Sequence, residues 1–256
     1  MGSNRFVANG HPSLAIRYGT FLFRARNAIF PLALLGLIIF FPPVFAWTSA
    51  WADIEMDIVG LAVGFAGIVL RAAVVGTAYI KRGGVNRRVY ADQLVTEGIF
   101  AHVRNPLYVG NILILAGLFI VANNPWGYLL GIGFFLVSYM SIVAAEETYL
   151  LEKFGAEYAA YCRSVPRWWI NFRGLRRTLR NYRINWRRIV VKEYTSIATW
   201  ILMNLVVFAY EEFINEALAD AASEIAAAAV GMTVTGVLVL TVRGLKKSGV
   251  FNSGHA

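Results

Sequence analysis

Long apolar stretches alternate with short polar segments along most of the chain. Such stretches lie at Ala28–Trp47, Ile58–Ile80, Pro106–Val121, Pro125–Ala145, Tyr194–Tyr210 and Ile225–Val242. A helix needs about 20 apolar residues to cross the roughly 30 Å hydrocarbon core of a bilayer. The third and fifth stretches lie at or below the short end of that range, so we expect five to six spans. The pattern predicts an all-α fold, a polytopic transmembrane helical bundle.

The composition agrees with a membrane protein. Apolar residues make up 58% of the 256 residues and charged residues only 15%, with a mean hydropathy of +0.56. Soluble globular domains carry about 25% charged residues, so this chain cannot cover itself with a polar surface. The same composition excludes a disordered, collagen-like or coiled-coil chain.

The net charge of +9 raises the question of nucleic acid binding. Every Lys and Arg except Arg71 lies before the first stretch, between the second and third, between the fourth and fifth, or after the sixth, and two of the remaining connections are acidic. The positive-inside rule therefore places both termini and the two long basic loops in the cytoplasm. The charge indicates topology, and no nucleic acid partner is expected.

Three parts follow from this layout: a basic cytoplasmic lead at 1–27, a membrane core at 28–170, and a basic linker with a last helical pair at 171–256. In the linker, apolar residues recur every three or four positions with arginines between them: Phe172, Leu175, Leu179, Tyr182, Trp186 and Ile189. This spacing predicts one basic amphipathic helix lying in the headgroup layer. An anchor to anionic lipids is the first interpretation, and a substrate-recruiting or regulatory role is the alternative.

The segment Gln93–Gly110 carries the first candidate chemistry. Pro106 suits the first position of a helix, so Asn105 falls at the N-cap, where its side chain is expected to accept hydrogen bonds from first-turn amides. Arg104 and Tyr108 would gather around that helix N-terminus, which attracts a carboxylate or another anion. A capped helix start without a ligand is the plain alternative.

Two adjacent carboxylates, Glu146 and Glu147, end the fourth stretch. Carboxylates close to a bilayer need cations, either from Arg and Lys or from a cationic ligand, and a solvated helix end without a ligand is the alternative. Gly155 is expected to break the helix that follows, and Tyr158 and Tyr161 are spaced to share one face.

Arg71 lies within the second stretch, about 14 Å along a helix from Ile80. An intramembrane arginine is a candidate for function, and an ion-paired structural arginine is the equal alternative. Gly60, Gly64 and Gly67 indicate close helix packing rather than a phosphate-binding loop. Cys162 is the only cysteine and the three histidines are scattered, so no metal site is expected.

Three linked motifs give a resemblance to a known family: GIFAHVRNPLYVG at 98–110, EETYL at 146–150 and FGAEYAAYCRSVPRW at 154–168. Their order and spacing resemble the bacterial branch of the isoprenylcysteine carboxyl methyltransferase and phospholipid methyltransferase superfamily. The resemblance covers about residues 93–169 and implies an integral membrane enzyme that uses S-adenosylmethionine, with 28–170 as the methyltransferase core.

The resemblance also implies a set of cofactor-binding residues. By position these are Gln93, Leu94, Val95, Phe100, Asn105, Pro106, Tyr108 and Glu146. The α-carboxylate of the cofactor suits the helix N-terminus with Arg104, and its sulfonium and ammonium groups suit Glu146 or Glu147. An aromatic ring of Phe100 or Tyr108 can contact the sulfonium or the adenine.

The motifs depart from the isoprenylcysteine enzymes in two places. Those enzymes have Arg-His-Pro where this chain has Arg104, Asn105 and Pro106. They also have an arginine that contacts their substrate four residues before the first glutamate of the pair, and this chain has Ile142 at that position. A prenylcysteine acceptor is therefore not expected, and the Asn-Pro form is closer to the phospholipid methyltransferases.

The sequence thus predicts methyl transfer to a lipid-like or amphipathic acceptor at the cytoplasmic face of a bacterial inner membrane. Arg104, Tyr108 and Glu147 are the predicted catalytic residues, with Tyr108 or Glu147 accepting a proton, and Arg71 and Arg104 are predicted to orient the acceptor. Two alternatives are an NADPH-dependent reductase similar to sterol reductases and a non-enzymatic membrane protein or small transporter.

Overall fold

The computed structural model describes residues 7–8, 11–44, 50–77, 89–181, 184–215 and 221–251. The helices in these ranges are α1 (Leu14–Phe40), α2 (Ala50–Thr77), α3 (Pro106–Ala122), α4 (Gly133–Ser164), α5 (Leu175–Asn181), α6 (Trp186–Asn215) and α7 (Ala222–Lys247). Two shorter helical turns are η1 (Gly98–Ala101, 3₁₀) and η2 (Gly127–Ile132, π). A two-residue antiparallel pair, β1 (Val7–Ala8) and β2 (His11–Pro12), precedes α1.

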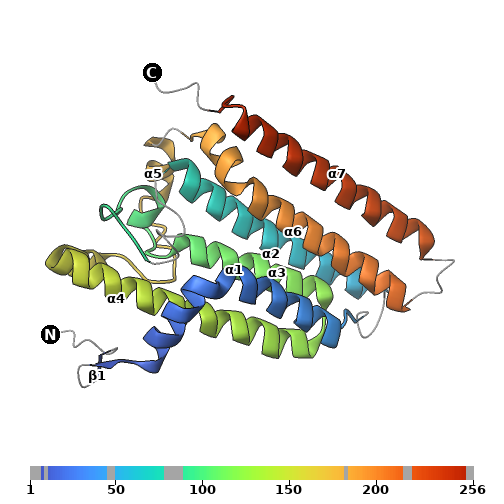
Figure 1. Ribbon diagram of the computed structural model, residues 1–256, viewed down its shortest axis with the longest axis horizontal. Helices are drawn as coiled ribbons and strands as arrows, with labels where there is room; N and C mark the ends of the chain where they lie inside the picture. Colours follow the sequence, from blue (N-terminus) through green and yellow to red (C-terminus); the bar gives the residue numbers. More distant parts are fainter. Residues whose placement is uncertain are drawn as a thin grey trace.

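The long helices run side by side in one bundle (Figure 1). Helix α2 packs on α3, α1 packs on α4, and α6 lies between the α2–α3 pair and α7. The end of α2, the start of α3, α5 and the end of α7 lie toward the same end of the bundle in Figure 1, which we call the basic end. All-α architecture is therefore confirmed, apart from the short β1–β2 pair.

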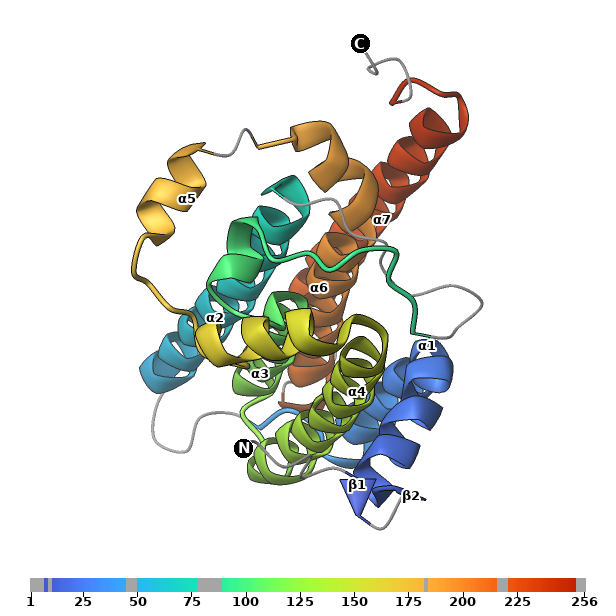
Figure 2. The same ribbon diagram turned by 90° about the vertical axis from the view of Figure 1, so that its left-hand side faces the viewer.

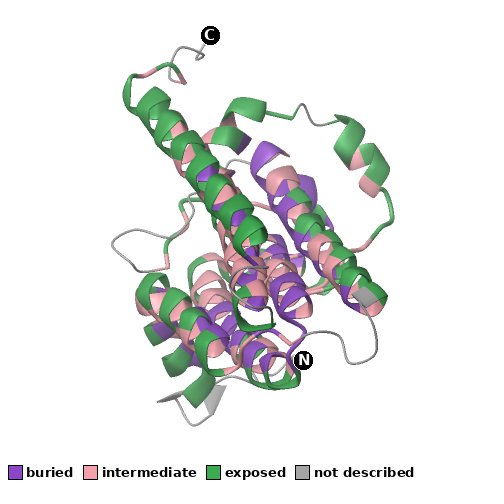
Figure 3. Cartoon of the chain, turned by 90° about the vertical axis from the view of Figure 1, so that its right-hand side faces the viewer, coloured by how far each residue is buried: buried purple, intermediate pink, exposed green. Residues whose placement is uncertain are grey.

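Five of the described helices are long and apolar enough to cross a membrane, and the shorter apolar helix α3 is the sixth member of the bundle. This agrees with five to six predicted spans. Helix α7 is mostly exposed along its length (Figure 3), and its exposed residues include Val230, Val234, Val237, Leu238 and Leu240. A surface of that kind is stable when lipid covers it.

Several helices extend beyond the apolar stretches that predicted them. Helix α1 begins at Leu14, where the Ser13 side chain accepts a hydrogen bond from the Ile16 amide. Helix α4 continues past Ala145 to Ser164, with a break at Gly155, whose φ of +51° is unfavourable for other residues. The apolar stretches mark only the part of each helix that suits lipid. The predicted ends Trp47 and Ile80 lie outside the described residues.

Glycines bring α2 and α3 into close contact. A Cβ atom on Gly117 would lie 2.4 Å from the Gly60 carbonyl oxygen, and one on Gly67 would lie 2.6 Å from the Gly110 carbonyl oxygen. The two backbones can approach to this distance only because neither side has a side chain there. The close packing predicted from the glycine spacing is confirmed.

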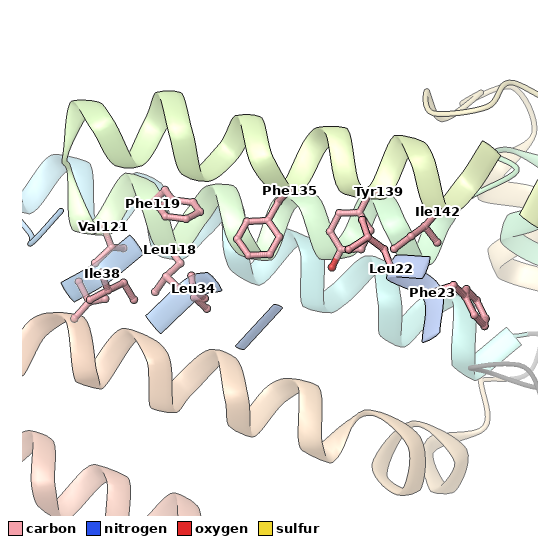
Figure 4. Packing of buried hydrophobic residues seen from close by; sticks show 12 residues of the cluster. Leu22, Phe23, Leu34, Ile38, Leu118, Phe119, Val121, Phe135, Tyr139 and Ile142 are labelled. Atoms are coloured by element: carbon pink, nitrogen blue, oxygen red, sulfur yellow. The ribbon is translucent and has the colours of Figure 1, made fainter. Parts of the chain in front are cut away.

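Aromatic side chains join α1 to α4 in the core. The ring of Phe30 meets those of Phe135 and Tyr139 edge-on, with centroids 5.3 and 5.2 Å away. Figure 4 shows Phe119, Phe135 and Tyr139 following one another along the bundle between the helices. This packed column fixes α4 relative to α1 and α3.

The basic linker differs from the single amphipathic helix that its periodicity predicts. Helix α5 ends at Asn181 and α6 begins at Trp186; Tyr182 lies outside the described residues. Asn185 explains the new start: its side chain accepts a hydrogen bond of 2.9 Å from the Arg188 amide, and its own amide donates to the Gly76 carbonyl. The N-cap and this tie to α2 separate the two helices, although Trp169 and Phe172 stay exposed beside the arginines.

Candidate active site

A cavity of about 1390 Å³ lies among α1, α3, α4 and α6, toward the basic end of the bundle. Figure 2, which looks onto the left-hand end of Figure 1, shows how α1, α4 and α6 lie relative to one another at this end of the bundle. All predicted cofactor residues line it: Gln93, Leu94, Val95, Phe100, Asn105, Pro106, Tyr108 and Glu146. Arg71 and Arg104 line it as well, whereas Glu147 does not.

The polar segment before α3 is held in place by the last turns of α4. The Tyr161 hydroxyl donates a hydrogen bond of 2.7 Å to the Phe100 carbonyl, and the Arg104 amide donates to the Pro166 carbonyl over 2.9 Å. Farther along the cavity wall, Lys153 donates to the carbonyl of Ala91. The two separated motifs therefore form one structure around the cavity.

Tyr158 and Tyr161 share a face of α4, as their spacing predicts. Their ring centroids are 6.0 Å apart, and both side chains are buried. Both also line the cavity. The break at Gly155 turns this last part of α4 so that it can cover the segment that precedes α3.

Asn105 occupies the N-cap of α3 and Pro106 the first helical position, as predicted, but the predicted capping hydrogen bond is wrong. The Asn105 side chain instead donates from Nδ2 to Glu147 Oε1 over 3.0 Å and to the Arg167 carbonyl over 3.3 Å. A hydrogen bond to an ionised carboxylate is stronger than one between neutral groups, which accounts for the orientation of the amide. Asn105 thus joins the start of α3 to α4.

Glu147 has the cations that its position near the membrane demands. Its carboxylate lies 3.5 Å from Arg104 Nη1 and 3.1 Å from Arg167 Nε. Burial alone would lower the pKa of the Arg104 guanidinium, but Glu147, Cys162 and Tyr158 together raise it above the ordinary value. Arg104 Nη1 also donates to Cys162 Sγ. Arg104 therefore stays a fixed cation at the cavity wall.

Glu146, the neighbouring carboxylate, faces the cavity. The Tyr108 hydroxyl donates a hydrogen bond of 2.5 Å to Glu146 Oε1, and Arg26 Nη1 donates to the same hydroxyl over 3.1 Å. The Tyr108 ring also packs against Tyr139 with a centroid distance of 5.5 Å. Arg26, Tyr108 and Glu146 come from α1, α3 and α4, so three helices converge on one polar chain.

Arg26 is a site residue that the sequence analysis missed. It lies in α1, just before the first predicted apolar stretch, and lines the cavity. Its guanidinium also sits over the Phe23 ring, 4.3 Å from the centroid. The available signal was a cation immediately before an apolar stretch, but the positive-inside rule alone already explains a cation at that position.

Arg71 forms an ion pair inside the bundle, as the structural alternative expects, and it also lines the cavity, as the functional one expects. Its Nη2 lies 2.8 Å from Glu193 Oε2, and the exposed fractions of the two side chains are 5% and 1%. Arg71 Nη1 donates to Asn111, and Nη2 donates to the Ser196 hydroxyl over 3.0 Å. Glu193, the second residue that the sequence analysis missed, is a single acid among the cations of the linker.

His102 connects the same region to α5. It is buried, with Nδ1 2.7 Å from the Asn171 carbonyl oxygen and Nε2 2.8 Å from the Thr178 hydroxyl. Within the described ranges, no group of three or more His, Cys, Asp and Glu side chains is placed to hold a metal ion.

Comparison with known proteins finds one family model that matches part of the chain. Residues 57–157 match the model of the family described as phospholipid methyltransferase. No curated protein and no solved structure matches the chain. The matched segment runs from α2 into α4 and contains Arg71 and every predicted cofactor residue, whereas α1, α6 and α7 lie outside it. The match covers less than half of the chain, and it is consistent with the superfamily that the motifs of this membrane protein resemble.

Proposed function

We propose that this protein transfers a methyl group from S-adenosylmethionine to a lipid-like acceptor at the cytoplasmic face of a bacterial inner membrane. One observation carries the proposal. Of the eight residues expected to bind the cofactor, seven lie within 93–108 and one is Glu146 of α4, and all eight line a single cavity and lie inside the segment that matches a methyltransferase family.

The residues of the cavity suit the charges of the cofactor. Within the described residues, Arg104 Nε is buried and has no hydrogen-bond partner, so a donor at the wall is available to a carboxylate. The N-terminus of α3 adds its positive dipole at the same place. Glu146 offers a carboxylate to the sulfonium or ammonium group, and Phe100 offers a ring face.

When bound, S-adenosylmethionine supplies a methyl group activated by a positively charged sulfur. The protein then has to align two partners and exclude water from between them. Tyr108 is placed to accept a proton from the acceptor, because Glu146 can take the hydroxyl proton through the 2.5 Å hydrogen bond. Arg26 would keep the hydroxyl of Tyr108 directed along this path.

The deeper part of the cavity suits an acyl chain. Its walls there are apolar and come from α1, α3 and α6, with Leu34, Leu115, Leu118 and Met203 among them. A cavity with a polar end and an apolar end is complementary to an amphipathic molecule. The proposed acceptor therefore enters from the bilayer and presents its polar group to Tyr108.

A thermal-shift panel on the purified protein in detergent tests the cofactor. We expect S-adenosylmethionine to raise the midpoint of unfolding and NADPH to leave it unchanged, because only a ligand bound to the folded state stabilises it. Stabilisation by NADPH alone would favour the reductase alternative. No shift with either ligand would favour the scaffold or transporter alternative and contradict the proposal.

A further inference from the structure

Helix α6 lies outside the matched family segment, yet it forms a wall of the cavity. Ser196, Trp200 and Met203 repeat at intervals of four and three residues, so they lie on one face of α6, and all three line the cavity. The cavity volume of about 1390 Å³ exceeds the roughly 300–1,000 Å³ usual for a pocket that holds one small ligand. The cofactor residues lie on the other walls, so the α6 side has room for a second molecule.

The polar groups along α3 lie at two depths. Tyr108, which contacts Glu146, is three residues before Asn111, which accepts a hydrogen bond from Arg71. Three residues of α-helix rise about 4.5 Å, so Arg71 lies roughly one helical turn deeper in the bundle than Tyr108. Beyond Arg71 the α3 residues on the cavity wall are apolar: Ile114, Leu115 and Leu118. Arg71 therefore marks the boundary between the polar and apolar parts of the cavity.

The guanidinium of Arg71 is held in a fixed orientation at this boundary. Nε donates to Glu193 over 2.9 Å, Nη2 donates to Ser196 over 3.0 Å, and Nη1 donates to Asn111. Two of these three partners are on α6, so α6 determines where the guanidinium lies. The Glu193 carboxylate also balances its charge, as an ionised side chain inside a membrane requires.

We propose that Glu193 is a positioning residue for the acceptor, which holds Arg71 at the cavity wall so that the guanidinium orients the polar head of an amphipathic acceptor beside Tyr108. This inference rests on the proposed methyl transfer and adds that the acceptor subsite is built by α6. Arg71 contributes a hydrogen-bond donor whose charge is already balanced. The head group at that depth is therefore a neutral or singly anionic oxygen acceptor rather than a second cation.

The test measures methyl transfer from labelled S-adenosylmethionine to a total lipid extract in mixed micelles, together with cofactor affinity by calorimetry. For Glu193→Gln we expect the apparent KM for the lipid extract to rise about tenfold or more, because the positioned donor is lost. Cofactor affinity should stay within about twofold of the wild type, since the interaction with cofactor is not changed. Glu193→Asp should give a KM between those of the wild type and Glu193→Gln.

Glu211→Gln is the matched control, because Glu211 is a buried acid on the same helix but outside the cavity. This variant should leave the KM for the lipid extract and the cofactor affinity unchanged. If Glu193→Gln does not fold, Ser196→Ala removes one partner of Arg71 without leaving a buried charge unpaired, and it should raise the same KM. An unchanged KM in the folded variants would overturn the positioning role of Glu193 while leaving the proposed function intact. A wild-type protein that binds no cofactor, or that methylates no lipid, would instead overturn the proposed function and this inference with it.

Discussion

The hydroxyl of Tyr108 donates a hydrogen bond of 2.5 Å to the carboxylate of Glu146, across the cavity wall between α3 and α4. These residues belong to two motifs, one at the start of α3 and one past the apolar stretch of α4, so two apolar stretches of the sequence separate them. Arg26 of α1 donates to the same hydroxyl, so the pair is held from a third direction. This contact connects the proposed cofactor side of the cavity to the side from which an acceptor would arrive.

Replacement of Glu146 tests the cofactor side of the pair. Glu146→Gln keeps the shape of the side chain but removes its charge, so the cations of the cofactor lose their counter-charge. We expect the dissociation constant for S-adenosylmethionine to rise by about 10- to 100-fold, as for the loss of a hydrogen bond to a charged group. Calorimetric titration measures it, and Glu146→Ala should abolish binding in a protein that still folds. The control is Glu152→Gln, which changes an exposed acid of the same helix and should leave affinity unchanged.

Replacement of Tyr108 tests the proton path. Tyr108→Phe retains the ring that packs on Tyr139 but removes the hydroxyl between Arg26 and Glu146. For an acceptor that must lose a proton, kcat should fall by about 100-fold or more, because a positioned general base contributes that much. Tyr128→Phe removes a hydroxyl that bonds Asn123 outside the cavity, so its kcat should match the wild type. An equal kcat in the two variants would show that the Tyr108 hydroxyl takes no part in the reaction.

The same measurements of kcat and cofactor affinity distinguish the role of Glu147 from that of Tyr108. The carboxylate of Glu147 contacts Arg104, Arg167 and Asn105 rather than the cavity, so we expect it to position the cofactor site. Glu147→Gln should weaken cofactor binding by about tenfold, through the looser hold on Arg104, and leave kcat at saturating cofactor within about twofold. A large fall in kcat would instead support the sequence-based prediction that Glu147 is a base. Glu157→Gln, an exposed acid of α4, serves as the control.

The close contact between α2 and α3 predicts a large stability effect from a single methyl group. In Gly117→Ala the added Cβ would lie 2.4 Å from the Gly60 carbonyl oxygen and 2.5 Å from the Gly64 amide nitrogen. Backbone atoms of a packed helix cannot move away freely, so we expect a loss of about 1–3 kcal/mol in unfolding free energy and a lower midpoint in detergent. Gly133→Ala places a methyl group in open space within a helix and should be neutral or stabilising by about 0.5–1 kcal/mol. Equal midpoints for the two variants would contradict the close packing.

Local sequence patterns predicted most of the bundle and the identity of the residues around its cavity. A stretch of some twenty apolar residues has few alternatives to a membrane helix, and Pro106 after Asn105 marks a helix start for steric reasons that tertiary structure does not change. The resemblance predicted that Phe100, Tyr108 and Glu146 would lie around one site, because the superfamily's cofactor pocket uses the corresponding positions.

Contacts between distant helices were not predictable in the same way. The Asn105 side chain donates to Glu147 and does not accept from the helix amides, since a hydrogen bond to the carboxylate that α4 provides is stronger than one between neutral groups. Asn185 ended the periodicity of the basic linker by capping α6. Glu193 reaches Arg71 across 122 positions of the sequence, and no periodic pattern carries that information.

In the proposed function, the cavity delivers a methyl group from S-adenosylmethionine to a lipid. The most direct measurement incubates purified wild-type protein with methyl-labelled cofactor and a total lipid extract, and follows the label by mass spectrometry. We predict that a lipid gains the mass of one labelled methyl group, and that Glu146→Gln at the same cofactor concentration loses most of the product. Label that remains entirely in the cofactor, in a preparation where the folded protein binds it, would contradict a lipid acceptor and with it this account of the cavity.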